Sequence, residues 1–163
     1  MFIKRYFEKY PMVAKWRDET IAKCKKDGFV ETLMGRRRYI PEIKSPNFQI
    51  RSSGERMAIN MPVQGTASDI IKVAMNRIDE ETAERGLQSR MILQVHDELI
   101  FEGPRAEIDD VRELCLRVMP KSLDMVVPLK IDIKTGTSWG ELEVARGPLL
   151  SEAEAELSFA EAG

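Results

Sequence analysis

His96, Asp97 and Glu98 are three adjacent residues whose side chains could do chemistry together, and His96 is the only histidine in the chain. They lie between two apolar runs, Met91–Val95 and Leu99–Phe101, which are typical of buried strands. Two carboxylates held on a rigid sheet suit a hard divalent cation, which would offset their mutual repulsion. The other interpretation is an exposed polar turn whose charges face solvent, and the pattern alone slightly favours it.

A second polar group lies in the segment ERMAINMPVQGT. Arg56 and Asn60 are four residues apart, so they share one face if this segment is helical. Gln64 continues that face only if the chain stays helical through Pro62. Arg, Asn and Gln side chains hydrogen-bond base edges and sugars, which indicates a nucleic-acid surface. The alternative is an ordinary polar helix face, and the spacing alone favours this alternative.

Three consecutive arginines, Arg36, Arg37 and Arg38, follow Gly35, and Arg51 extends the basic segment. Guanidinium groups suit phosphate oxygens, so the run indicates contacts with a nucleic-acid backbone. A solvated run of charges explains the same pattern equally well.

The net charge of −2 hides an asymmetry between two parts of the chain. Residues 1–56 carry a net charge of +7, and residues 57–163 carry −9. A basic half favours a polyanionic partner, whereas an acidic half favours solubility or metal binding. Two solvated faces of opposite sign are the simpler explanation, and composition alone favours them.

Secondary structure has to position these polar groups, and hydrophobic periodicity predicts helices and short strands for the first part of the chain. The first predicted elements are a helix over Phe2–Lys26 interrupted at Pro11, a hairpin of Phe29–Leu33 and Arg38–Ile40, and a loop over Pro41–Gln49. A helix follows from Ser52 or Ser53 to Met61, where Pro62 ends it, and a second helix reaches Arg85.

The remaining part of the chain adds the two apolar strands around His96, a helix opening at Pro104 and a half-buried strand over Leu129–Ile133. This order of elements predicts an α+β fold with helices packed on one face of an antiparallel sheet. We expect residues 1–143 to form the folded part. Residues 144–163 are acidic and rich in Ala and Glu, and we expect a flexible tail there.

The composition narrows the class of protein. A chain of 163 residues with 43% hydrophobic residues fits one compact domain or part of a larger one. No apolar run approaches the roughly 20 residues that span a bilayer, and the first residues lack the pattern of a signal peptide. The two cysteines have no CxxC spacing, so we expect reduced core residues and a cytoplasmic protein. Neither GxGxxG nor GxxxxGK[ST] occurs, so nucleotide-loop enzymes are unsupported.

Four blocks of the sequence, taken in order, resemble family A DNA polymerases of the bacterial DNA polymerase I type. The blocks are YFEKYP, GFVETLMGRRRYIP, ERMAINMPVQGTA and QVHDEL. The resemblance covers roughly residues 1 to 143. It implies the C-terminal, fingers-to-palm portion of a polymerase domain, with a palm-type antiparallel sheet and the third catalytic motif of the family.

The resemblance also implies roles for the first polar group. Asp97 would be a catalytic metal ligand, Glu98 an auxiliary carboxylate beside it, and His96 a residue near the primer terminus. The implied cofactor is Mg²⁺ in a two-metal site, and only part of its ligands lie in this chain. The implied reaction is template-directed DNA synthesis from primer–template DNA and a dNTP.

The other polar groups become DNA contacts in the same way. Arg56, Asn60 and Gln64 would face the minor groove of the template–primer and the nascent base pair. Arg51 and the cluster Arg36–Arg38 would contact the nucleic-acid backbone, with Arg51 the better supported.

Two features of the family have no counterpart in this sequence: an upstream palm motif with another metal-binding aspartate, and a helix that holds the incoming nucleotide. We therefore expect a second polypeptide to supply them, and we expect the chain alone to be inactive. If the protein is bacterial, we expect it to be associated with the nucleoid. The alternatives are a non-catalytic DNA-binding remnant of a polymerase and a structural fragment without independent function.

Overall fold

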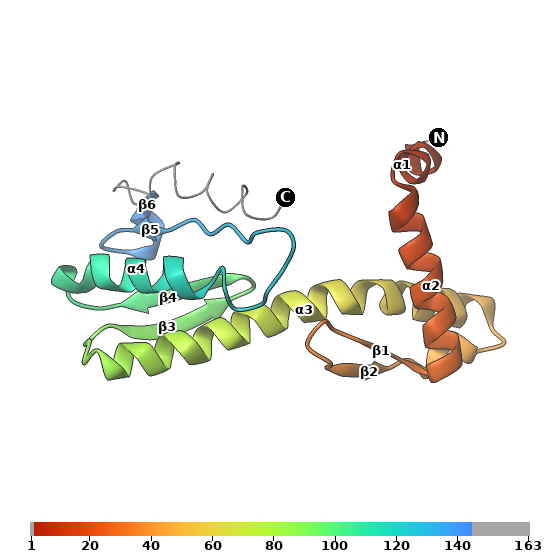
Figure 1. The fold of residues 1–163 in the computed structure, drawn as a ribbon, viewed down its shortest axis with the longest axis horizontal. Coiled ribbons are helices and arrows are strands. Elements are labelled where there is room, and N and C mark those ends of the chain that lie inside the picture. Colours follow the sequence, from red (N-terminus) through yellow and green to blue (C-terminus); the bar gives the residue numbers. More distant parts are fainter. Residues whose placement is uncertain (1, 145–163) are drawn as a thin grey trace.

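One long helix determines the shape of the molecule. The computed structural model describes residues 2–144, and helix α3 (Phe48–Glu84) runs along its longest axis. The N-terminal elements pack against one half of α3, and the C-terminal elements pack against the other half (Figure 1). Because each half of α3 contributes to its own hydrophobic core, α3 fixes how the two ends of the molecule are placed.

The N-terminal half consists of two helices, a hairpin and a short 3₁₀ helix. These are α1 (Phe2–Lys9), α2 (Pro11–Asp27), β1 (Phe29–Glu31), β2 (Arg37–Tyr39) and η1 (Pro41–Lys44). The predicted interruption at Pro11 and the predicted antiparallel hairpin are confirmed. Gly28 ends α2 with a φ of 81°, and its N–H donates to the Cys24 carbonyl at 2.8 Å.

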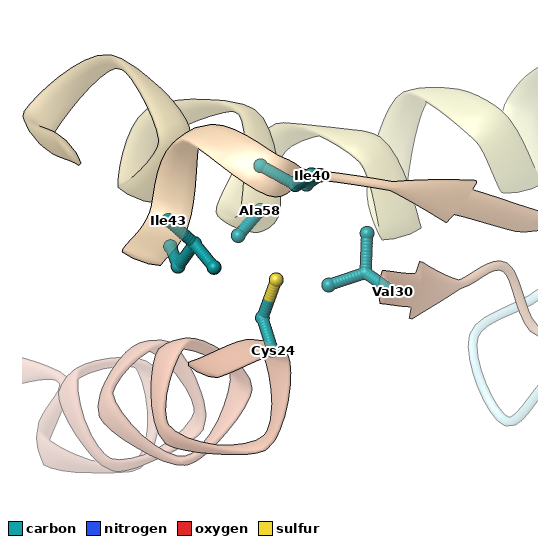
Figure 2. Packing of buried hydrophobic residues seen from close by; sticks show 5 residues of the cluster. All are labelled: Cys24, Val30, Ile40, Ile43 and Ala58. Carbon is teal, nitrogen blue, oxygen red and sulfur yellow. The ribbon is translucent and has the colours of Figure 1, made fainter. Parts of the chain in front are cut away.

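The first core lies between α2, the hairpin, η1 and the first half of α3 (Figure 2). It is formed by Cys24, Val30, Ile40, Ile43 and Ala58. Gly54 allows η1 to approach α3 closely, because a Cβ at that position would lie 2.8 Å from the backbone nitrogen of Ile43.

Helix α3 begins earlier than the sequence predicted, and it continues through Pro62. Asn47 caps it rather than Ser52 or Ser53, and the Asn47 Oδ1 accepts from the Gln49 N–H at 2.9 Å. The predicted break at Pro62 is wrong, because a single helix of 37 residues contains this proline. A proline inside a helix costs about 3 kcal/mol or more, so contacts from other elements must offset that cost.

The C-terminal half packs a hairpin and a helix against the other part of α3. Its elements are β3 (Arg90–Val95), β4 (Glu98–Glu102), η2 (Arg105–Glu107) and α4 (Ile108–Val118). The two predicted strands and the predicted helix are thereby confirmed. Their predicted burial is wrong, because Ile92 and Leu93 of β3 are exposed and no residue of either strand is fully buried. The second core is formed by Ala74, Ile78, Leu114, Cys115 and Val118, with Met91, Leu99 and Phe101 of the hairpin packed against it.

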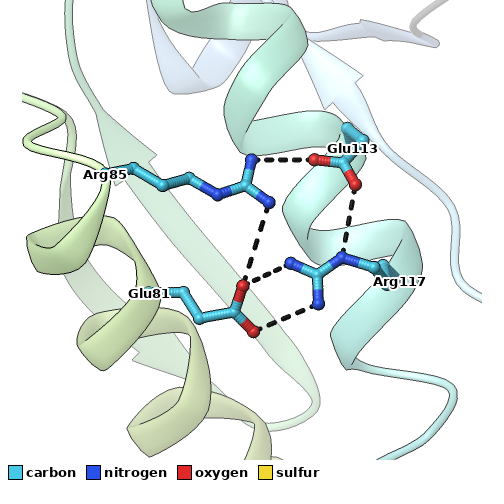
Figure 3. A network of polar contacts seen from close by, with 4 residues as sticks. All are labelled: Glu81, Arg85, Glu113 and Arg117. Carbon is cyan, nitrogen blue, oxygen red and sulfur yellow. Dashed lines mark hydrogen bonds and ion pairs between the residues drawn. The ribbon is translucent and has the colours of Figure 1, made fainter.

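Four charged side chains connect α3 to α4 at the surface (Figure 3). Arg85 Nη1 lies 2.8 Å from Glu113 Oε2, and Arg117 pairs with both Glu81 and Glu113. These arginines lower the pKa of the Glu81 and Glu113 carboxyl groups below their usual values. Each acid is thus most stabilising in its ionised form.

The last described strands are β5 (Lys134–Thr135) and β6 (Glu143–Val144), which are antiparallel and enclose the 3₁₀ helix η3 (Trp139–Glu141). The predicted strand over Leu129–Ile133 is wrong, since this segment is not paired with another strand. Ile131 and Ile133 nevertheless pack against the second core. The alternating pattern therefore reports burial of one face without strand pairing.

The α+β class is confirmed, and within residues 2–144 the strands form three separate two-stranded antiparallel sheets. No helix in this range is both long and apolar enough to cross a membrane. Val144, which we placed in the tail, pairs with Lys134 in β6. The rest of the expected tail, residues 145–163, lies outside the described residues.

Candidate functional site

His96 and Asp97 form the two-residue turn of the β3–β4 hairpin, because Val95 pairs with Glu98. His96 has a φ of 54°, and within the described residues it is the only non-glycine residue with a positive φ. This region is disfavoured for side chains with a Cβ and costs on the order of 1–3 kcal/mol. The Gln94 amide donates to the His96 carbonyl at 2.8 Å and helps to hold the turn.

The side chains of this turn are presented to solvent on a rigid base. His96, Asp97 and Glu98 are all exposed, whereas Leu99 and Phe101 anchor the following strand in the second core. The turn end of the hairpin points along α3 toward the N-terminal half (Figure 1). The sequence-predicted metal ligands thus stand at the tip of an anchored hairpin.

Asp97 and Glu98 have the right chemistry for Mg²⁺, since both offer hard carboxylate oxygens. In the described part of the chain, however, no group of three or more His, Cys, Asp or Glu side chains is arranged to hold a metal ion. The hairpin tip therefore fits one part of a metal site, and further ligands would have to come from elsewhere.

The structure places Arg56, Asn60 and Gln64 on one exposed face of α3. The condition for this alignment is met, because α3 stays helical through Pro62. Arg56 Nη1 donates to Ser52 Oγ at 3.3 Å, one turn earlier on the helix. We call these three exposed residues the polar row.

The polar row continues directly into the face of α3 that carries the C-terminal half. Successive steps of three or four residues lead from Gln64 to Ala67, Ile71, Ala74 and Ile78. Ala74 and Ile78 are fully buried in the second core, on which the β3–β4 hairpin packs. The polar row and the hairpin that carries Asp97 consequently occupy the same side of α3.

The arginines of the β1–β2 hairpin are all engaged within the chain. Arg36 Nη2 lies 2.6 Å from Asp69 Oδ1, and Arg37 Nε donates to Glu31 at 2.7 Å. Arg38 Nη2 lies 3.5 Å from the sulfur of Met57. The Arg36 and Arg37 side chains nonetheless stay more than half exposed.

The hairpin arginines do not lie with the polar row. The hairpin turn contacts α3 at Gly65, Thr66 and Asp69. At about 100° of rotation per residue, this contact face is opposite the face that carries Asn60 and Gln64. The structure therefore separates the two predicted DNA-binding groups on different sides of α3.

Arg51 supports the chain segment before α3. Its Nη1 donates to the carbonyls of Ser45 and Pro46 at 3.0 and 3.3 Å, and its guanidinium lies over the Phe48 ring. Because the side chain is only partly buried, its remaining N–H groups stay accessible to solvent.

The residue that sequence reasoning missed is Asp69, which is 3% exposed. Its Oδ2 accepts from Thr32 Oγ1 at 2.7 Å, and its Oδ1 forms the ion pair with Arg36. The sequence feature that could have indicated its burial is its position directly before the apolar pair Ile70 and Ile71. Nothing in the spacing identified its partners, which lie more than thirty residues away.

Residues 1–141 match the sequence pattern of DNA polymerase family A. This match covers most of the chain, and the chain belongs to that family. The β3–β4 hairpin carries the motif His96-Asp97-Glu98 that the resemblance identified, with His96 and Asp97 in the turn and Glu98 at the start of β4, on a fold of the expected class.

Named relatives are bacterial DNA polymerases. The chain is 49% identical to DNA polymerase I of Bacillus subtilis and 44% identical to the thermostable DNA polymerase I of Thermus thermophilus, each over 138 residues. Both alignments cover 85% of this chain and 16% of the relative. The chain thus spans about one-sixth of the length of these relatives.

A solved structure has the same fold. It is the POL domain of Pol1 from M. smegmatis in complex with DNA primer-template and dNTP. The TM-score is 0.76 at 41% identity, and the alignment covers 78% of this chain and 23% of that one.

Proposed function

We propose that this chain forms the C-terminal palm segment of a DNA-directed DNA polymerase and acts in template-directed DNA synthesis. The observation that carries the proposal is the placement of the Asp97 turn and the polar row on one side of α3. Support also comes from the solved relative, which holds primer-template DNA and a dNTP.

Asp97 and Glu98 would each contribute carboxylate oxygens to Mg²⁺, with Glu98 in the auxiliary role. The bound Mg²⁺ supplies charge neutralisation for phosphoryl transfer. His96, held at its unusual φ, would lie beside the primer terminus. The anchored turn fixes the backbone from which these side chains project, so the backbone need not be ordered on binding.

The polar row would contact the minor groove of the primer–template and the nascent pair. Arg56 contributes a charge, while Asn60 and Gln64 contribute hydrogen-bonding groups that suit bases and sugars. Arg51 would contact the nucleic-acid backbone with the N–H groups that its internal partners leave accessible. The Arg36–Arg38 cluster lies on the other side of α3, so it would contact a part of the backbone away from the polar row.

The remaining machinery would come from a second polypeptide. Two-metal phosphoryl transfer needs ions roughly 3.5–4 Å apart, and this hairpin tip presents only two adjacent carboxylates. We therefore propose that a complementary chain supplies the other aspartate and the nucleotide-holding helix.

The second candidate function is non-catalytic DNA binding by a polymerase remnant. It is favoured by one observation: all three residues of the polar row lie on one exposed face of α3, whereas residues 2–144 hold no group of three or more side chains that could bind a metal ion. Under this alternative, the chain binds duplex DNA but never supports synthesis.

Reconstitution tests the choice between the two. The chain is mixed with the preceding part of the Bacillus subtilis polymerase domain, and primer extension is measured across a Mg²⁺ titration. We expect extension only in the mixture, abolished by Asp97→Ala and reduced less by Glu98→Ala. Asp79→Asn, an exposed acid elsewhere on α3, is the matched control. Extension that survives Asp97→Ala unchanged would refute the catalytic proposal.

A further inference from the structure

Pro62 creates a structural problem inside the polar row. A proline lacks the N–H that would bond the carbonyl of Ala58, and its ring crowds the preceding turn, so kinks usually form at such sites. Arg56 and Asn60 lie before Pro62, whereas Gln64 lies after it. The three share one face only if something holds both sides of α3 in line.

The β1–β2 hairpin contacts α3 before the proline. Val30 and Ile40, on and directly after its strands, pack with Ala58 in the first core, and Met57 and Met61 pack against the same core. These contacts attach the hairpin to the turns of α3 that carry Arg56 and Asn60.

The turn of the same hairpin contacts α3 after the proline. Gly65 leaves room for Thr32, because a Cβ at Gly65 would lie 2.6 Å from the Thr32 methyl carbon. Thr66 Oγ1 accepts from the Leu33 N–H at 3.0 Å and donates to the Pro62 carbonyl at 2.5 Å. One rigid hairpin is therefore attached on both sides of the proline.

Asp69 organises the second attachment. Its carboxylate accepts from Thr32 Oγ1 and pairs with Arg36, while Thr32 Oγ1 in turn accepts from the backbone N–H groups of Met34 and Arg36. A buried carboxylate is costly unless it is paired, so this geometry is retained only while both partners stay in place. No catalytic or DNA-binding role accounts for an acid at this position.

We propose that Asp69 is a positioning residue, which holds the β1–β2 hairpin as a splint across Pro62 and thereby aligns Gln64 with Arg56 and Asn60. The inference rests on the proposed function, because the aligned residues are the proposed DNA contacts. Asp69 itself would not contact DNA, since it is buried against Thr32 and Arg36 of the β1–β2 hairpin.

The test is a set of duplex-binding measurements on the full chain with a fluorescent primer–template. Gln64→Ala and Arg56→Ala are made in the unmodified chain and in Asp69→Asn, whose amide cannot satisfy both Thr32 and Arg36. In the unmodified chain we expect each substitution to weaken binding about 2- to 10-fold. In Asp69→Asn, we expect Gln64→Ala to have no further effect and Arg56→Ala to keep its full effect.

A purely structural role for Asp69 would reduce the folded fraction without separating Gln64 from Arg56. If Gln64→Ala weakens DNA binding by the same factor in the unmodified chain and in Asp69→Asn, the positioning role of Asp69 is overturned, but the proposed function is not. If neither Gln64→Ala nor Arg56→Ala weakens binding in the unmodified chain, the polar row is not a DNA surface and the proposed contact falls too.

Two further variants guard against loss of the fold. Thr32→Val removes the hydroxyl that donates to Asp69 and accepts from the Met34 and Arg36 N–H groups, and we expect it to reproduce the selective loss of the Gln64 effect. Thr32→Ser keeps the hydroxyl, so Gln64→Ala should still weaken DNA binding in that variant. Amide hydrogen exchange over residues 63–69 should speed up in Asp69→Asn and Thr32→Val, but not in Asp79→Asn. Unchanged exchange would also overturn the proposal.

Discussion

Asn60 and Ile78 lie eighteen residues apart on α3, which is about five whole helical turns, and so they point in the same direction. Asn60 is exposed, whereas Ile78 is fully buried beneath the C-terminal half. One face of one helix therefore serves first as a polar surface and then as a packing surface. This relationship is why the polar row lies on the same side as the β3–β4 hairpin.

Arg56→Ala should weaken binding to duplex DNA and change its salt dependence. Arg56 brings one positive charge to the DNA and so displaces counterions even from the minor groove. Since one neutralised phosphate contributes about 0.9 to the slope of log affinity against log salt, we expect the slope to fall by up to that amount. Asn60→Ala should lower affinity without changing the slope. Fluorescence anisotropy over a salt series measures both, with Lys72→Ala as a basic control away from the row. An unchanged slope for Arg56→Ala would show that Arg56 is an ordinary solvated residue and does not contact DNA.

His96→Gly should stabilise the fold while impairing the reconstituted enzyme. The positive φ of His96 is strained for a residue with a Cβ but not for glycine, so we expect a gain of about 1 kcal/mol. Urea denaturation of the full chain measures this gain. Val95→Gly, one residue earlier in β3, is the control and should destabilise. A loss of stability in His96→Gly would show that the imidazole makes a structural contact that outweighs the strain.

Asp97→Ala should leave the fold intact. The Asp97 side chain is exposed next to Glu98, so its removal relieves repulsion between carboxylates in the metal-free protein. The thermal midpoint of the part that contains the β3–β4 hairpin should therefore hold or rise, even though activity in the reconstituted mixture is lost. A lower midpoint would identify Asp97 as a structural acid instead.

Acid should destabilise the protein through Glu107. The Glu107 carboxylate accepts from the backbone N–H groups of Gln88 and Ser89 and from Ser89 Oγ, and these bonds lower its pKa. Because the pKa is lower in the folded state, this stabilisation is present above about pH 5 and is lost as the pH falls through the folded value. Thermal midpoints at pH 7 and pH 4 should differ less in Glu107→Gln than in the unmodified chain. Equal differences would mean that other acids, such as Glu81 and Glu113, account for the effect.

Both cysteines should be unreactive while the chain is folded. Burial raises the pKa of the Cys115 thiol to about 12, and it also raises the pKa of Cys24. Since the thiolate is the reactive form, iodoacetamide at pH 8 should label neither residue in native buffer and both in denaturant. Peptide mass spectrometry reads the result. Rapid native labelling of Cys115 would show that α4 opens readily.

The sequence predicted most of the local structure, because caps, turns and periodicity are local signals. Gly28 and the β3–β4 strands follow directly from such signals. Pro62 was misjudged for the opposite reason: the contacts that keep α3 continuous come from Thr32 and Leu33, thirty residues away. Leu129–Ile133 was misjudged because alternation records burial and does not identify a pairing strand.

Only the part of the candidate site that forms a contiguous sequence motif could be predicted. The adjacency of His96, Asp97 and Glu98 is visible in the sequence, but the strain at His96 is not. The role of Asp69 could not be predicted, because the sequence does not distinguish a buried acid from an exposed one when its partners are distant along the chain.

Within the described residues, α3 is the only element that contributes buried side chains to both cores. Such an arrangement divides the molecule into two cooperative units that are coupled only through the backbone hydrogen bonds of α3. Heat or denaturant should therefore melt the two ends at different midpoints, and native-state exchange should sort the amides into two classes. Whatever stiffens the middle of α3, a bound duplex included, would fuse the two transitions into one.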